Sequence, residues 1–508
     1  MASINYGVCN ECRKRVPVEH VIRDGKVYVR KDCPDCGPTE ALVSSDAARW
    51  QRKRQMCHYD ADAPLHCTLQ CETCGFKHNP RMVFLDVTNR CNMNCPICIA
   101  NIPGMGFEFH PPLPYFDHIL TELGKLNPKP LVQLFGGEPT VREDLFEIIA
   151  MARRNGLDAR IVTNGLKLAD EEYCKRLCES KVHVLLAFDG NAPDIYQRLR
   201  KNPGAYEKKL MALENLGKYS GHKNTIMCCV ARGINDQHMR GLIDFCHDKR
   251  AYIKCLHCIP LTETWEEGEF ETGVATTTED VEQIISDAFP EDPVEFIPAG
   301  LTEHLRPPAR FFGVLKLKFG GAHPNCESAA LLVSDGRRYW PLSHYLKMPV
   351  DKIAEDLVAR CEKINPRLSR LDPDKALQRL WGRLIIIRAF VGLGLKAVNL
   401  RRALKGNRLL SALKILCGPL VGQKLKTQLR KHSNAIDVML MVVLPFEEYH
   451  SVESARLQNC WTGFVYEDPV TNEVETIPVC MWGIYKSDLQ RRIADRYRQR
   501  QAVAAKPA

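Results

Sequence analysis

Between residues 81 and 260, short apolar runs alternate with longer amphipathic stretches such as REDLFEIIAMARRNG, in which apolar residues recur at helical spacing. Alternation of this kind predicts βα units on a parallel sheet, hence an α/β fold. Six strands are expected, enough for a partial or open (β/α)6 barrel. Their sequences are MVFLDV, LVQLF, ARIVTN, VHVLLAFD, NTIMCCVA and AYIKCLH.

The first 80 residues show little helical periodicity and predict short hairpins and loops. Asp24-Gly25 is a hairpin turn signal between two β-rich runs. Two Cys-x2-Cys pairs flank this hairpin, which predicts a closed tetrahedral site for one Zn or one Fe. The alternative is four incidental thiols. The expected ligands are Cys9, Cys12, Cys33 and Cys36.

The chain has 23 cysteines but no basic region followed by an apolar run at its start, MASINYGVCN, and no uncharged apolar stretch of membrane-spanning length. We therefore expect a cytoplasmic protein that does not span a membrane. Because cytosolic thiols are kept reduced, disulfides explain the cysteines poorly, and metal ligation is the better interpretation.

Three further cysteines, Cys91, Cys95 and Cys98, follow the first predicted strand within eight residues. A four-iron cluster bound by protein alone needs four thiolates, so a triplet leaves one iron open. An open iron can chelate the amino and carboxylate groups of S-adenosylmethionine (SAM). The alternative is a cluster completed by a distant cysteine, with a structural or electron-carrying role.

The second predicted strand ends in Gly136, Gly137, Glu138 and Pro139. Glycines permit close backbone approach to a small ligand, and Glu138 could accept a hydrogen bond from an ammonium group. Alone this tetrapeptide is a weak signal, because glycine pairs usually make turns. One strand after a CxxxCxxC loop it becomes a strong one.

With these motifs, residues 81–260 resemble the radical SAM superfamily. The resemblance implies a SAM-binding [4Fe-4S] cluster, an electron donor such as ferredoxin or flavodoxin, and cleavage of SAM to methionine and a 5′-deoxyadenosyl radical. Three polar residues at later strand ends could also reach SAM, although each could equally be a cap or turn residue. They are Asn164, Asp189 and Asn235.

A second triplet, Cys67, Cys71 and Cys74, has the same spacing as the first. No apolar strand precedes it and no GGEP loop follows at one βα unit, so we interpret it as an auxiliary [4Fe-4S] site. Cys57 or His78 would complete that site. The alternative for His78 is an ordinary surface histidine.

Three late cysteines, Cys326, Cys460 and Cys480, suggest a second auxiliary cluster. The last two bracket a hairpin-like segment with a turn near DPVTNE, which would bring them together. The alternative is small buried hydrophobes. Three domains are expected: a Cys-rich module at 1–80, the radical SAM core at 81–300, and an auxiliary-cluster domain at 301–508.

The combination of HCTLQCETCGFKH, DVTNRCNMNCPICIA and ESARLQNC with IPVCMW is similar to a narrower family. It resembles the archaeal tetraether lipid synthases and their bacterial relatives, many of which carry the older label 7,8-dihydro-6-hydroxymethylpterin methyltransferase. The reaction implied joins terminal methyl carbons of two lipid chains. Two segments depart from the family's pattern and could line the substrate chamber: KCLHCIPLTETWEEG, with Cys255 and Cys258, and VVLPFEEYHSVE.

Residues 375–436 contain fourteen Lys or Arg and no Asp or Glu. Taking these fourteen from the formal net charge of +9 leaves −5 for the rest, so the basicity is local. Apolar runs broken by basic residues between Trp381 and Leu420 suit interfacial helices on anionic lipid. The alternative is core helices with solvated basic edges. Nucleic acid is not expected, because aromatic residues are sparse here.

The leading hypothesis is a radical SAM enzyme, peripheral at the inner face of the membrane, that forms C–C bonds at unactivated carbons of lipid chains. A radical SAM C-methyltransferase acting on a pterin-like small molecule is the first alternative. A non-catalytic iron–sulfur electron-transfer protein is the second.

Overall fold

The N-terminal region forms a four-stranded antiparallel sheet, here called the ribbon, in this computed structural model. The structure describes residues 4–57, 59–73, 78, 80–263, 270, 272, 274–312, 323–446 and 450–504. Asp24 and Gly25 make the predicted tight turn. Both have positive φ, and the residues on either side of them, Arg23 and Lys26, are paired across β2 and β3. The strands are β1 (Tyr6–Val8), β2 (Arg15–Arg23), β3 (Lys26–Cys33) and β4 (Gly37–Ser44).

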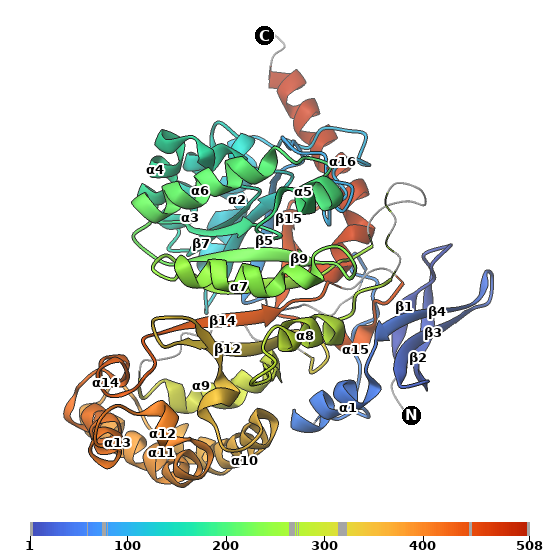
Figure 1. Ribbon diagram of the computed structural model, residues 1–508. Coiled ribbons are helices and arrows are strands. Elements are labelled where there is room, and N and C mark those ends of the chain that lie inside the picture. The colour runs from blue at the N-terminus through green and yellow to red at the C-terminus, as the bar shows by residue number, and fades with distance from the viewer. Residues whose placement is uncertain are drawn as a thin grey trace.

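The centre of the molecule is a run of six parallel strands in sequential order (Figure 1). Each coincides with one of the six predicted apolar runs, so the expected α/β open barrel is confirmed. All seven residues of the first of these strands are buried. The strands are β5 (Met82–Thr88), β6 (Leu131–Gly136), β7 (Ala159–Thr163), β8 (His183–Ala187), β9 (Asn224–Val230) and β10 (Ile253–Pro260).

Strands that follow β10 in the chain extend this sheet at both edges. At one edge β14 adds in parallel to β10, and β12 adds antiparallel to β14. At the other edge β15 adds in parallel to β5, and β16 forms the predicted hairpin with it. The domain boundaries at 80 and 300 remain predictions, but the sheet crosses the second. These strands are β11 (Ile297–Pro298), β12 (Ser328–Ser334), β13 (Tyr339–Pro341), β14 (Asp437–Val443), β15 (Thr462–Glu467) and β16 (Val474–Pro478).

Helices between the parallel strands cover the outer face of the sheet (Figure 1). In α3 the residues that pack inward, Leu145, Ile148, Ile149 and Ala152, recur at the predicted helical spacing. These helices are α2 (Leu113–Lys125), α3 (Leu145–Arg154), α4 (Glu171–Glu179), α5 (Pro193–Arg200), α6 (Ala205–Tyr219), α7 (Met239–Asp248) and α8 (Thr278–Asp287). Short 3-10 helices occur at η1 (Pro139–Val141), η2 (Leu166–Ala169), η3 (Asp236–His238), η4 (Ala299–Leu301), η5 (Leu342–Tyr345) and η6 (Gly418–Val421).

A group of helices at the far end of the sheet contains residues 375–436, here called the acid-free segment because they include no Asp or Glu (Figure 1). Across the residues that the structure describes, none of the helices combines the length and apolarity needed to cross a bilayer. The helices of this group are α9 (Thr302–Ala309), α10 (Val350–Leu368), α11 (Ala376–Ala397), α12 (Leu400–Ala403), α13 (Arg408–Cys417) and α14 (Leu425–His432).

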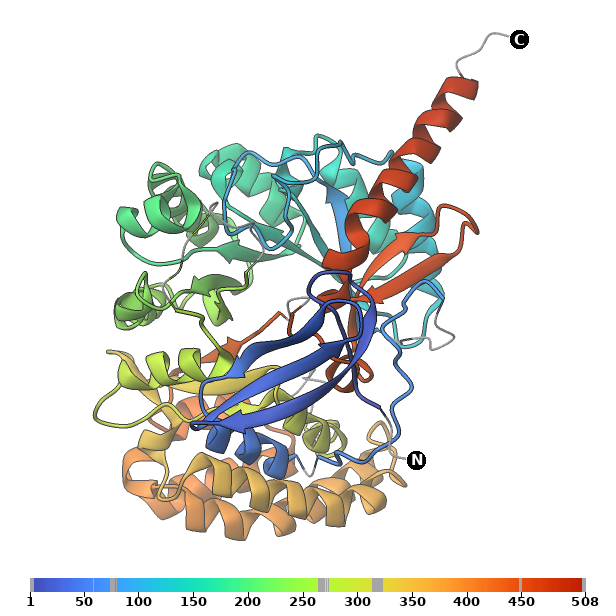
Figure 2. The same cartoon turned by 90° about the vertical axis from the view of Figure 1, so that its right-hand side faces the viewer.

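Helix α1 (Ala47–Met56) was not expected in a region predicted to hold only hairpins and loops. Its inward face includes Lys53, which is fully buried and ion-paired with Glu279 at 2.7 Å and Glu282 at 2.6 Å. A buried charge at a core position hides the apolar periodicity, which is why the pattern failed here. The two remaining helices are α15 (Ser454–Leu457) and α16 (Val479–Ala504), the latter projecting from the molecule in Figure 2.

Candidate active site

The three cysteines of the CxxxCxxC motif lie in the loop that leaves β5, and all three line a cavity of about 170 Å³. This cavity, called the cluster cavity, lies at the carboxyl ends of the parallel strands, where α/β folds bind ligands. Burial raises the pKa of Cys91 to about 12 and also raises that of Cys95. Metal binding at these thiols therefore has to displace protons.

Asn89 closes the base of this cluster loop, residues 89–109. Its side-chain amide donates to the Phe107 carbonyl at 2.6 Å, and its Oδ1 accepts from the Phe109 amide at 2.8 Å. Asn89 is 7% exposed, so these bonds are shielded from water. The sequence analysis missed this residue, because an asparagine after a strand usually signals only a turn.

Gly136 and Gly137 allow a close approach of backbone to backbone, whereas the sequence predicted an approach of backbone to a small ligand. A Cβ on Gly136 would lie 2.2 Å from the Thr88 carbonyl oxygen, and one on Gly137 would lie 2.3 Å from that of Arg90. Backbone bonds join the same segments, from Gly137 N to Thr88 O at 2.7 Å and from Glu138 N to Arg90 O at 2.9 Å. The glycines thus let the loop after β6 pack against the cluster loop, and both also line the cluster cavity.

The carboxylate of Glu138 is 1% exposed and joins the ends of β6 and β7. Its Oε1 accepts from the hydroxyls of Thr140 at 2.6 Å and Thr163 at 2.7 Å, and from the Thr140 amide at 3.1 Å. Its Oε2 accepts from the Asn164 amide at 2.7 Å. Oε1 therefore has no lone pair left for another donor. The hydrogen bond expected from an ammonium group can form only at Oε2. Pro139, next along, is buried in η1.

The three polar residues predicted at strand ends do not share one place. Asn164 lines the cluster cavity, and its side-chain amide donates to Asn92 of the cluster loop at 2.7 Å. Asp189 and Asn235 stand behind the lining. The Asn235 amide donates to the carbonyls of Asp189 at 2.9 Å and Cys229 at 2.7 Å, which is a structural cap.

Asp189 instead holds Arg200, a cavity-lining residue that the sequence analysis missed. The pair is bidentate, at 2.8 and 2.9 Å, and the Asp189 side chain is fully buried. Burial opposes ionisation of Asp189, but the Arg200 guanidinium lowers its pKa below the ordinary value. Arg200 thus brings a fixed positive charge to a cavity whose other described polar groups are mostly neutral. No sequence signal marks it, because Arg200 ends a helix rather than a strand.

The ribbon contains the predicted four-thiolate group. The Sγ atoms of Cys9, Cys12, Cys33 and Cys36 all lie within 4.8 Å of one another, and Cys12 and Cys33 are 3.7 Å apart. A tetrahedral site with Zn–S bonds of about 2.3 Å has sulfur–sulfur edges of about 3.8 Å, so the thiols fit one ion. The backbone amide of Cys12 lowers the pKa of the Cys9 thiol, which favours the thiolate a metal needs.

The proposed auxiliary ligands are placed only in part. Cys67 is buried, the Cys71 amide donates to Tyr485 Oη of α16 at 3.3 Å, and Cys74 lies outside the described residues. His78 is described, and burial lowers its pKa. Cys57 lines a separate cavity of about 440 Å³. The other candidates, all half-buried, are Cys326, Cys460 and Cys480.

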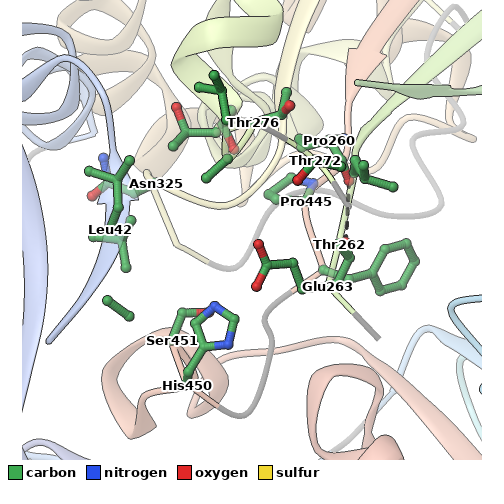
Figure 3. A pocket seen from close by; sticks show the side chains of 18 of the residues that line it. Leu42, Pro260, Thr262, Glu263, Thr272, Thr276, Asn325, Pro445, His450 and Ser451 are labelled. Carbon is green, nitrogen blue, oxygen red and sulfur yellow. Dashed lines mark hydrogen bonds between the residues drawn. The ribbon is translucent and has the colours of Figure 1, made fainter. Parts of the chain in front are cut away.

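Two more cavities adjoin the cluster cavity. An aromatic cavity of about 120 Å³, lined by Phe84, Phe464 and Trp482 among others, shares Ile99, Ala100 and Phe135 with it. The larger one, about 410 Å³ and here called the polar chamber, shares Pro260, Leu261 and Thr262 (Figure 3). The segment VVLPFEEYHSVE, which departs from the family's pattern, contributes Pro445, Phe446, His450 and Ser451 to the polar chamber.

The other segment that departs from the family's pattern, KCLHCIPLTETWEEG, contributes Pro260, Leu261, Thr262 and Glu263 to the same chamber, but its two cysteines do not line it. Cys255 and Cys258 are buried in β10 and line none of the cavities described above, so the expectation that they line the substrate chamber is not met. Burial raises the pKa of Cys255 to about 12. Both thiols pack as small hydrophobes.

Comparison with known families agrees with this geometry. Residues 85–246 match the radical SAM superfamily, and residues 3–45 match the "HMPTM N-terminal zinc ribbon domain". Residues 85–246 are therefore a radical SAM domain, and the chain that contains it is an enzyme. The class implies a [4Fe-4S] cluster and SAM, for which the donor set of the cluster cavity is suited.

Among curated proteins, the chain is 31% identical over 278 residues to the 7,8-dihydro-6-hydroxymethylpterin dimethyltransferase of Methanocaldococcus jannaschii, covering 52% of this chain and 54% of that one. It is 33% identical over 140 residues to the Fe-coproporphyrin III synthase of Methanosarcina barkeri, covering 27% and 34%. The chain thus spans about half or less of the length of these relatives. Its activity as a whole is not given by them.

Similar solved structures include anSMEcpe with bound AdoMet, with a TM-score of 0.34 and 22% identity over 41% of this chain and 59% of that one. Streptococcus suis SuiB bound to S-adenosylmethionine has a TM-score of 0.35 and 12% identity over 55% and 68%.

Proposed function

We propose that this enzyme forms C–C bonds at unactivated carbons of lipid chains while docked on an anionic membrane surface. A [4Fe-4S] cluster on Cys91, Cys95 and Cys98 would bind SAM and supply the electron that yields a 5′-deoxyadenosyl radical, which removes hydrogen from an inert carbon. The chain's own groups orient SAM. Oε2 of Glu138 can accept a hydrogen bond from the amino group of SAM. The positive charge of Arg200 can pair with the carboxylate of SAM.

The observation that carries the proposal is an apolar stripe on α11 that faces solvent. Leu377 is 84% exposed, Trp381 60% and Leu384 41%, at the spacing of one helix face. Leu409, Leu413 and Val421 add apolar side chains that are 78%, 57% and 75% exposed. This set, with the exposed basic residues around it, is the basic helical surface. The basic residues are Arg388, Lys396, Arg401, Arg402, Lys405, Arg408, Lys414, Lys424, Lys426, Arg430 and Lys431.

The basic helical surface exposes leucine side chains to solvent and contains no acidic residue, which suits the headgroup region of an anionic bilayer. It argues against the alternative of core helices with basic edges, whose leucines would face inward. The same surface supports two further parts of the proposal, a peripheral location at the inner face of the membrane and a lipid substrate. A ferredoxin or flavodoxin as electron donor and one or two auxiliary clusters remain part of the proposal.

The test is lipid mass spectrometry of a heterologous host that expresses the chain anaerobically. Wild-type protein should yield new coupled or alkylated lipids, and a Cys91→Ala, Cys95→Ala, Cys98→Ala variant should yield none. If the host assembles the iron–sulfur clusters of the protein and its lipids are nevertheless unchanged, a lipid substrate is refuted.

A second candidate is C-methylation of a pterin-like small molecule. The polar side chains of the chamber beside the cluster cavity favour it, as does the likeness to the pterin dimethyltransferase of Methanocaldococcus jannaschii. Accumulation of an unmethylated pterin in a deletion strain, with lipids unchanged, would establish this candidate in place of the first.

A further inference from the structure

The polar chamber opens from the cluster cavity at the end of β10. Its volume, about 410 Å³, is in the range of small-molecule sites. Pro260, Leu261 and Thr262 line both spaces, so a molecule in the chamber can extend one end toward the cluster cysteines. The position suits the substrate rather than SAM, because Cys91, Cys95, Glu138 and Arg200 line only the cluster cavity.

Segments far apart in the sequence form the walls. Figure 3 shows Leu42 of β4 on one side, Thr276 before α8 on another, and Pro445 after β14. The ribbon is fixed against the barrel by the bond between Ser45 Oγ and Thr277 Oγ1, at 3.0 Å. The ribbon adds Asn10, Glu40, Ala41 and Val43 to the lining. The ribbon is therefore a wall of the chamber and not a separate appendage.

Most of the polar side chains in the lining carry hydroxyl or amide groups. Thr262, Thr272, Thr276 and Asn325 contribute such groups, and Figure 3 places Glu263 and His450 around the same space. Two glutamates and one arginine, Glu40, Glu263 and Arg456, leave the lining with a net charge of only about −1, so it favours neither a strong anion nor a strong cation. Side chains of this kind recognise neutral groups that both donate and accept hydrogen bonds.

We propose that the polar chamber holds the polar part of the substrate, a neutral group rich in hydroxyl or amide-type donors and acceptors, while the reacting carbon points past Thr262 into the cluster cavity. The inference rests on the proposed function and sharpens it. Both candidate substrate classes carry such a group, the glycerol unit of an ether lipid or the ring of a pterin. The metal ribbon then takes part in substrate recognition.

The experiment measures binding of two probes, a short-chain glycerol monoether and 6-hydroxymethylpterin, by calorimetry. It uses the full chain, anaerobically reconstituted and saturated with SAM. Leu42→Trp fills the chamber from the ribbon side. Ile22→Trp is the matched control, because Ile22 is 48% exposed on β2 of the same ribbon and does not line the chamber. Ribbon metal content reports whether each variant folds, and Thr272→Leu tests the opposite wall if Leu42→Trp loses its metal.

Wild type and Ile22→Trp should bind at least one probe, and the filled variant should bind it at least tenfold more weakly. Which probe binds identifies the substrate class. The proposal is overturned if wild type binds neither probe, or if the filled variants bind as wild type does. Release of 5′-deoxyadenosine is measured in parallel. Wild-type protein that releases it but fails the binding test loses only the chamber proposal, whereas protein that never releases it fails the proposed function.

Discussion

At the scale of single residues, the GGEP motif works by packing backbone against backbone. Gly136 and Gly137 leave room for the carbonyls of Thr88 and Arg90, and Glu138 fixes the ends of two strands. The cluster loop is thus supported by the neighbouring βα loop. A motif associated with ligand binding here also sets the position of the cluster ligands.

Gly137→Ala should therefore damage the cluster site. The added Cβ would lie 2.3 Å from the Arg90 carbonyl oxygen, which belongs to backbone and cannot rotate away. We expect a loss of about 1–3 kcal/mol in stability and reduced iron after reconstitution, measured by metal analysis. Gly241→Ala in α7 is the control, since its Cβ would meet nothing within 4 Å. Full iron content in Gly137→Ala would show that the contact is dispensable.

Arg200→Lys should weaken SAM binding by about tenfold, because an ammonium cannot keep the bidentate pair with Asp189 while facing the cavity. Equilibrium dialysis with labelled SAM measures the change. Arg198→Lys is the control, since Arg198 donates to the backbone carbonyls of Gly233 and Ile234, which do not line the cavity. Equal affinities in the two variants would remove Arg200 from the SAM site.

At the scale of elements, the ribbon is attached through buried polar contacts. Glu453, 2% exposed, accepts from Asn5 Nδ2 at 2.6 Å and faces His20 Nε2 of β2 at 3.2 Å. Burial acts to raise the pKa of Glu453, but His20, His323 and Arg456 together outweigh it, and the pKa falls to about 2 from an ordinary value of 4.5. The ionised carboxylate therefore stabilises the docked ribbon.

Because the pKa of Glu453 is lower in the folded state, its contribution is full above pH 4.5 and is lost as the pH falls toward about 2. At neutral pH, Glu453→Gln should cost about 3 kcal/mol of stability. The difference from wild type should shrink below pH 4.5. Denaturant unfolding of both proteins at matched pH values measures it, and a difference independent of pH would contradict this account.

At the scale of the whole molecule, the active site and the basic helical surface belong to one continuous sheet with its attached helices. Strand β14 follows directly on the acid-free segment and pairs with β10, whose end lines the cluster cavity. The surface that we propose to dock on lipid is thus connected to the wall of the site by a single strand. This arrangement would hold the cavity at a fixed position relative to the bilayer.

Wild-type protein should float with vesicles that contain anionic lipid and remain unbound with zwitterionic vesicles. Leu377→Ser, Trp381→Ser and Leu409→Ser combined should abolish flotation while sparing SAM cleavage, because these side chains are exposed. Met211→Ser with Val470→Ser is the control, as both lie exposed outside this surface. Flotation that survives the triple change would refute the basic helical surface as the membrane contact.

The sequence alone determined the elements whose signals are local. The six parallel strands, the Asp24-Gly25 hairpin, the ribbon thiols and the hairpin of β15 and β16 all follow from periodicity, turn residues or spacing within a few positions. Such signals survive because strand burial and turn geometry depend mainly on neighbouring residues.

Only the tertiary structure decided the rest. Arg200 reaches the cavity through its pair with Asp189, α1 is held by Lys53 against two distant glutamates, and the polar chamber forms where β4, β10 and the loop after β14 meet. These features depend on contacts between residues from 11 to more than 200 positions apart. No periodicity records them, because each is stabilised by a partner that only the folded chain brings near.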